Sequence, residues 1–185
     1  MEHLWNPEQD HELEDWMAVS RTDEAARSRR RTAAWMEHGP VDASLTGVLV
    51  DLAERGAEVV VTLSGGRIHR GVVLEVASTW VLIRTGSGDR VVIRLRCAES
   101  IDCTGLPNSF GERSASTTMG FVATLDQLVD IGATITMRTA HQTTRGELRL
   151  LGEEIAIVAI DAMTMRYVSM EAVDEVTIAG GSARS

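Results

Sequence analysis

The sequence predicts a mainly β protein with short helices, built from two tandem five-stranded small barrels that follow an N-terminal helical extension. Apolar and polar residues alternate along several short segments, and the same succession of segments occurs twice. The 185 residues are 44% hydrophobic and 24% charged, which is typical of a globular protein. All 18 basic residues are Arg, which excludes a catalytic or phosphate-binding lysine. The net charge of −9 disfavours duplex DNA as a partner.

The repeat defines the expected domains. Segment 56–63 recurs 76 positions later as 132–139, and from Arg70-Gly71 onward the offset is 75, which gives Arg145-Gly146. Apolar positions coincide over about 58 residues of each copy. We therefore expect a first barrel at 44–104 and a second at 120–178. The remaining segments are an acidic, partly helical extension at 1–43, a linker at 105–119 and a flexible tail at 179–185.

Each copy is expected to open with a short amphipathic helix. In the first copy the apolar residues stand at i, i+3, i+4 and i+7, with Ser44 as the N-cap and Gly56 just past the end. These apolar residues are Leu45, Val48, Leu49 and Leu52. The second copy repeats the pattern with Phe121, Leu125 and Leu128 and closes at Gly132.

Five short strands follow each helix. In the first copy Val59, Val61 and Leu63 should share one face of a strand, while Glu58, Val60 and Thr62 share the other. Further strands are expected at 68–76, 80–84, 90–95 and 99–102, with a turn at 86–89 that is predicted by composition. A helix and five strands in about 60 residues favour a small closed or half-closed barrel.

One motif resembles that of a known family. Val59-x-Val61-x-Leu63-Ser64-Gly65-Gly66-Arg67, followed by Gly71-x-Val73, is similar to the first motif of the Sm-like family, which includes the bacterial Hfq proteins. The second motif is echoed by 95–97 and by 170–172. The resemblance implies two strongly bent barrels and assembly into rings through pairing of edge strands. Three tandem chains would supply six barrels.

The residues that read RNA in this family are mostly replaced. The Asn of uridine-binding members falls on Val81 and Ala156, and the stacking pair of Hfq falls on 78–79 and 153–154, where no aromatic residue stands. The basic pair of Hfq falls on 95–96 and 170–171, so Arg96 is the RNA contact that the resemblance retains.

Two groups of arginines are candidate contact residues. The first copy is neutral and the second carries −5, so an anion or RNA would be held by the first copy. The candidates there are Arg67, Arg70, Arg94 and Arg96. The basic run Arg27, Arg29, Arg30 and Arg31 is a candidate for docking a partner. The alternative for both groups is a solvated surface, in the second case a helix face paired with Asp23.

No pattern indicates catalysis or a cofactor. His69 and His141 lie in different copies and have no nucleophile at a suitable spacing, and Gly65-Gly66 is typical of a hairpin turn rather than a phosphate loop. His11, among acidic residues, would bind a metal only loosely. Cys97 and Cys103 are too few for a disulfide scaffold or a zinc site, so we expect reduced structural thiols. No catalytic residue, cofactor or metal is predicted.

We therefore expect a non-catalytic Sm-like interaction module that serves as a protein-assembly scaffold. The alternative is an RNA-binding regulatory protein that acts through the arginines of the first barrel. Expected partners are further copies of the chain, another protein or single-stranded RNA. The start of the chain lacks a secretory pattern, and the longest apolar run covers only 155–160. These features predict a cytoplasmic protein that does not enter a membrane.

Overall fold

The structure is a computed structural model, and it describes residues 44–104 and 115–180. These residues belong to one compact unit that begins at Ser44. The predicted extension at 1–43, with its arginine run, lies outside the described residues, as do most of the linker and residues 181–185 of the tail. Ten strands and two helices make the described part mainly β, as predicted.

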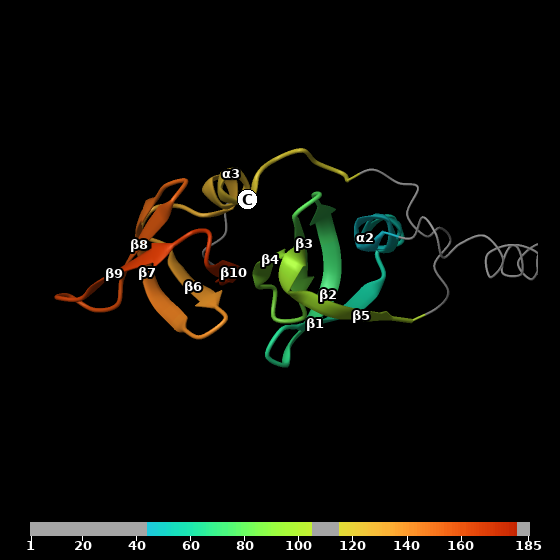
Figure 1. The fold of residues 1–185 in the computed structure, drawn as a ribbon, viewed down its shortest axis with the longest axis horizontal. Helices are drawn as coiled ribbons and strands as arrows, with labels where there is room; N and C mark the ends of the chain where they lie inside the picture. Colours follow the sequence, from blue (N-terminus) through green and yellow to red (C-terminus); the bar gives the residue numbers. More distant parts are fainter. Residues whose placement is uncertain (1–43, 105–114, 181–185) are drawn as a thin grey trace, which may run out of the picture. The chain divides into compact units, whose positions relative to one another are not determined.

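The elements follow the order expected for two copies (Figure 1). The first repeat (44–104) contains α2 (Leu45–Glu54), β1 (Glu58–Leu63), β2 (Arg67–Val76), β3 (Trp80–Thr85), β4 (Arg90–Arg94), the 3-10 turn η1 (Leu95–Cys97) and β5 (Ala98–Cys103). The second repeat (120–178) contains α3 (Phe121–Leu128), β6 (Thr134–Thr139), β7 (Thr143–Leu151), β8 (Ile155–Ala159), β9 (Met165–Ser169) and β10 (Val173–Ile178).

All ten strands form one antiparallel sheet in the order β5-β1-β2-β3-β4-β10-β6-β7-β8-β9. The two repeats therefore have the same internal strand order. Each also carries a register shift at the same place, between Val73 and Glu75 in one and between Leu148 and Leu150 in the other. These matching irregularities support the internal repeat that the sequence pattern indicated.

The sheet is open, whereas two separate small barrels were expected. In the first repeat β4 pairs with β10 of the second repeat and not with β5. This pairing satisfies backbone groups that closure of a five-stranded barrel would otherwise have to satisfy. Among the described strands, β5 pairs only with β1 and β9 pairs only with β8. Within the residues that the structure describes, the outer edges of β5 and β9 therefore have no partner strand.

The local signals act as expected at the start of the first repeat. Ser44 caps α2 by accepting a hydrogen bond from the Gly47 N–H at 3.0 Å. Gly56 follows the helix with φ +59°, a conformation that favours glycine. In β1 the side chains of Val59, Val61 and Leu63 are buried, as predicted. Cys97, which follows the strand expected at 90–95, lies in the turn η1 and is buried there.

The two hydrophobic cores are not equivalent. The core of the first repeat consists only of that repeat's own residues, from α2 through β5. The core of the second repeat also contains Trp80, Leu82 and Val92, which lie on the outer side of β3 and β4. Trp80 is fully buried, and its indole N–H donates to the carbonyl of Met119 at 2.8 Å. The first repeat thus completes the core of the second.

Candidate interaction surface

The two repeats meet where β4 lies beside β10. The register pairs Ile93 with Glu175 and Val92 with Val176. We call this strand pair, together with the polar side chains on either side of it, the junction. Its backbone ladder joins the two halves of the sheet, and its side chains decide which strand edges fit each other.

Glu175 is the most buried charged residue of the junction, with no exposed surface. One carboxylate oxygen lies 2.7 Å from Nε2 of His69, and the other accepts a hydrogen bond from Nη1 of Arg138 at 2.9 Å. Nε of Arg67 lies 3.9 Å from the first oxygen. Burial by itself would raise the pKa of Glu175, but the hydrogen bond with His69 and the surrounding positive charges outweigh it, so the pKa lies below its ordinary value. Glu175 is therefore held as a carboxylate.

Asp174 is the second acidic residue of the junction. Nη2 of Arg67 donates to one of its oxygens at 3.3 Å, and the Cys97 thiol lies 2.9 Å from the other. Burial and this hydrogen bond raise the pKa of Cys97. Cys97 is thus a protonated donor that joins the two repeats, and neither Cys97 nor Cys103 forms a disulfide.

Arg94 and Arg96 bind backbone carbonyls of the second repeat. Arg94 donates to the carbonyls of Val173 and Met170, both at 3.0 Å, and its guanidinium lies 4.1 Å from the ring centre of Phe121. Burial and the nearby charge of Arg96 lower the pKa of Arg94, which still remains protonated. Arg96 donates to the carbonyl of Glu171. The positive charges thus fix the loop between β9 and β10.

Of the four arginines predicted as anion or RNA contacts in the first repeat, the structure brings three together. Arg67, Arg94 and Arg96 all bind groups of the second repeat at the junction. Arg70 lies on β2 with an exposed side chain. The candidates Arg27, Arg29, Arg30 and Arg31 lie outside the described residues.

The acidic half of the junction was not predicted. Asp174, Glu175 and Arg138 are the residues that sequence reasoning missed. The signal was present in β10, where two consecutive acids interrupt an otherwise apolar strand, and all four residues from 173 to 176 are buried. A buried carboxylate needs a positive partner, and the arginines of the first repeat were available.

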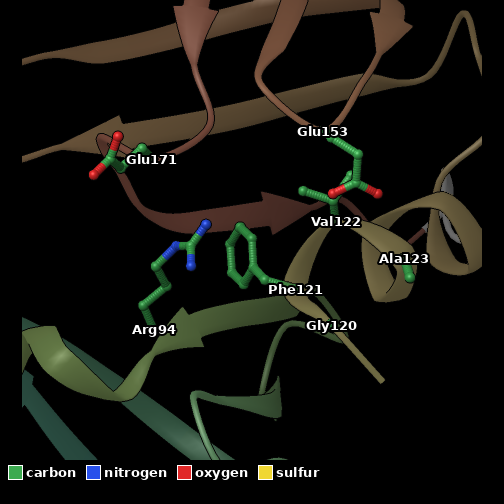
Figure 2. A pocket seen from close by; sticks show the side chains of 7 residues that line it. All are labelled: Arg94, Gly120, Phe121, Val122, Ala123, Glu153 and Glu171. Atoms are coloured by element: carbon green, nitrogen blue, oxygen red, sulfur yellow. The ribbon is translucent and has the colours of Figure 1, made fainter. Parts of the chain in front are cut away.

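A pocket of about 320 Å³ opens beside the junction. It is lined by Arg94, the start of α3 from Gly120 to Ala123, Glu153 and Glu171. Figure 2 shows the Arg94 guanidinium beside the Phe121 ring, with Glu153 and Glu171 on loops at the opposite side. Because Arg94 already binds two carbonyls and two carboxylates face the same space, the pocket is poorly suited to a phosphate group.

The end of the sheet formed by β8 and β9 carries a solvent-exposed apolar surface. Ile155, Ile157, Met165 and Tyr167 lie on one side of β8 and β9, since Ile157 pairs with Tyr167 and side chains alternate along each strand. Tyr167 is 69% exposed and Met165 is 46% exposed. We call these four residues the outer face. Their counterparts in the first repeat include Trp80, Leu82 and Val92, which the second repeat buries.

The two histidines of the described residues, His69 and His141, lie in different repeats. The His69 ring is engaged with Glu175, and His141 is exposed in the turn before β7, so the two histidines do not form a common site. Within 44–104 and 115–180, no cluster of three His, Cys, Asp or Glu side chains is suited to hold a metal ion. No helix in these ranges has the length and hydropathy needed to cross a membrane.

Comparison with known proteins adds no family to these observations, because no family model and no curated protein matches the chain.

Proposed function

We propose that this protein is a non-catalytic assembly module with two Sm-like repeats, which builds larger complexes by adding strands to the edges of its sheet. The observation that carries the proposal is the junction itself. The chain already joins two similar five-stranded units by edge pairing, and within the described residues β5 and β9 each have a neighbouring strand on one side only. Exposed strand edges are a standard means of association between proteins.

The outer face supports the same function. Exposed apolar residues gathered beside an edge strand are typical of an interaction surface. In the first repeat the corresponding residues, Trp80, Leu82 and Val92, are buried where β4 pairs with β10, and Val92 has no exposed surface. A strand added to β9 would bring comparable cover to Tyr167.

The alternative function is RNA binding through the first repeat. Arg70 is exposed and the Arg96 side chain is 50% exposed, so positive charge remains for phosphate contacts. Assembly is the better-supported function because the other two candidate arginines, Arg67 and Arg94, serve the junction. No aromatic side chain replaces the missing base-stacking residues at 78–79 or 153–154.

A proline at the edge of β9 tests the assembly function. The Met170 N–H donates to the carbonyl of Glu154, and the carbonyl of Thr164 accepts from the Ile160 N–H. The backbone N–H and C=O groups of even-numbered residues in β9 therefore point towards β8. By alternation, the N–H of Tyr167 points away from the sheet. Tyr167→Pro therefore removes a donor that only an added strand would use. We expect light scattering to show an oligomer for the wild type and a smaller species for this variant.

Tyr167→Phe is the matched control, because it keeps both the backbone donor and the apolar ring. A wild-type chain that stays monomeric up to high micromolar concentration would contradict the proposed assembly. RNA binding is tested in parallel with fluorescent uridine-rich and adenine-rich oligonucleotides. Affinity that falls steeply with salt and is lost in Arg70→Glu would favour the alternative function.

A further inference from the structure

We propose that the outer face of the second repeat binds an amphipathic helix of a partner protein, and that this helix carries basic residues on both sides of its apolar stripe. This binding mode goes beyond the proposed addition of strands, because the helix contacts a face of the sheet and leaves the strand edges free. Three features support it: the arrangement of the apolar side chains, the cover of the corresponding face in the first repeat, and the charges at the ends of the strands.

The outer face continues onto β7 and forms a row of apolar side chains across three strands. Leu150 of β7 pairs with Ile157 of β8, and Ile157 pairs with Tyr167 of β9, so the three side chains lie on one side of the sheet. Leu150 is 43% exposed and Tyr167 is 69% exposed. Neighbouring strands are about 4.8 Å apart, so the row is about 10 Å long. Residues i and i+7 of a helix lie about 10.5 Å apart on one side, so a helix that crosses the strands matches the row.

The corresponding face of the first repeat is covered in part by a helix. Val92, the counterpart of Tyr167, is buried in the core that also contains Phe121 and Leu125 of α3. Arg94 lies two residues further along β4, on the same face, and its guanidinium is 4.1 Å from the ring centre of Phe121 (Figure 2). Among the described residues, no helix gives such cover to β9, since Tyr167 is exposed. A helix is therefore the kind of element that suits this face.

The two helices of the described residues are not free to bind there in a second copy. α2 buries Leu49 and Leu52 completely in the first core, and α3 buries Phe121 and Leu125 in the second. An amphipathic helix that already packs its apolar stripe has no second stripe to offer. The proposed occupant is accordingly a helix of another protein.

Acidic residues lie at both ends of the strands that form the outer face. Glu154 and Glu171 lie in connections at one end, where the Met170 N–H donates to the Glu154 carbonyl, and Asp161 lies in the connection at the other end. All three are exposed, and within 44–104 and 115–180 no ion pair joins Glu154 or Asp161 to another residue. The second repeat carries −5 in total, so arginine or lysine is the complementary charge. A helix that crosses the strands midway turns each side of its apolar stripe towards one of these ends.

Two synthetic helical peptides of about five turns test the binding with the full chain. Both carry leucines at i, i+3, i+4 and i+7, and they differ only on the flanks, where one has arginines and the other glutamates. Fluorescence anisotropy should show that the arginine peptide binds at least about 10-fold more tightly. Circular dichroism should show that it gains helix on binding. No binding, equal affinities, preference for the glutamate peptide, or binding without added helix would overturn the inference.

A substitution on β7 locates the site. Leu150 lies two strands from the edge, so a strand added to β9 would not contact it. Leu150→Ser should weaken binding of the arginine peptide by about 10-fold. Leu74→Ser is the matched control, because Leu74 of β2 is 40% exposed and lies in the first repeat. With the fold of both variants verified by circular dichroism, equal effects of the two substitutions would overturn the assigned site.

A double substitution tests the charges at the two ends. Glu154→Gln/Asp161→Asn preserves the size of both side chains, and Asn keeps the oxygen that accepts two backbone N–H groups. Affinity for the arginine peptide should fall by about 3- to 10-fold at low salt and should then depend less on salt. Glu58→Gln/Glu99→Gln is the control, because it removes the same charge from exposed positions of the first repeat. Equal losses in both double variants would reveal a general charge effect and overturn the inference.

The results separate helix binding from the proposed assembly. A monomeric wild type that binds the arginine peptide contradicts the assembly function and supports helix binding. An oligomeric wild type that does not bind the peptide overturns helix binding alone. An oligomer that Leu150→Ser dissociates, but Leu74→Ser does not, would show that a second copy covers the outer face, and this would also overturn the inference.

Discussion

Replacing Glu175 by Gln tests whether the buried acid holds the two repeats together. The substitution preserves the size of the side chain and removes its charge, which leaves Arg67, His69 and Arg138 without their common carboxylate. Removing one partner from a buried ion pair costs about 3–5 kcal/mol. The three partner side chains keep 12% to 34% of their surface exposed, so water compensates part of the loss. We expect a decrease in the free energy of unfolding of about 2–4 kcal/mol.

Urea unfolding followed by far-UV circular dichroism measures this change, and the melting temperature should fall by about 5–15 °C. Glu154→Gln is the matched control, because Glu154 is exposed and the substitution keeps its backbone carbonyl, which accepts a hydrogen bond from the Met170 N–H. That control should change stability by less than about 0.5 kcal/mol. A loss below about 1 kcal/mol for Glu175→Gln would refute the view that the buried charge stabilises the junction.

Three further outcomes follow from the fold. Gly71→Ala should destabilise the protein by more than about 2 kcal/mol in urea unfolding, because a Cβ there would lie 2.1 Å from the Arg84 carbonyl oxygen. Gly86→Ala is the control and should not destabilise the protein in this way, because a Cβ there meets no atom within 4 Å. Since the pKa of Glu175 is lowered on folding, its contribution is fully present above the ordinary value of 4.5 and is lost as pH falls below it, which acid titration of stability will show. Cys97 should react with a thiol reagent only on unfolding.

The succession of one helix and five strands along each repeat could be predicted because it depends on local pattern. Alternation along β1 and the turn glycines Gly65 and Gly88, both with positive φ, are properties of adjacent residues. The repeat then doubled the signal, since segment 56–63 recurs as 132–139. The presence of five strands in each repeat could therefore be predicted from the sequence.

The junction could not be predicted from the sequence, because it depends on which strand edges of the two repeats pair. Arg94 and Arg96 were predicted to be contact residues, but their acceptors are backbone carbonyls about 75 positions away. Every residue has a backbone carbonyl, so residue types alone do not indicate which carbonyl accepts. The contrast between the copies carried the information. Where the first repeat has His69 the second has Thr144, and where the first has Ser100 the second has Glu175. Such differences between otherwise similar copies mark the contacts that one copy makes and the other does not.

The unequal cores determine the order in which the chain can fold as it is synthesised. Every residue of the first core precedes the linker, so the first repeat can collapse while the second is still being translated. The second core includes Trp80, Leu82 and Val92, and it therefore closes only on a surface that the first repeat has already formed. The first repeat can therefore serve as a template for the second, and the described sheet is complete only when β10 has been synthesised and can pair with both β4 and β6.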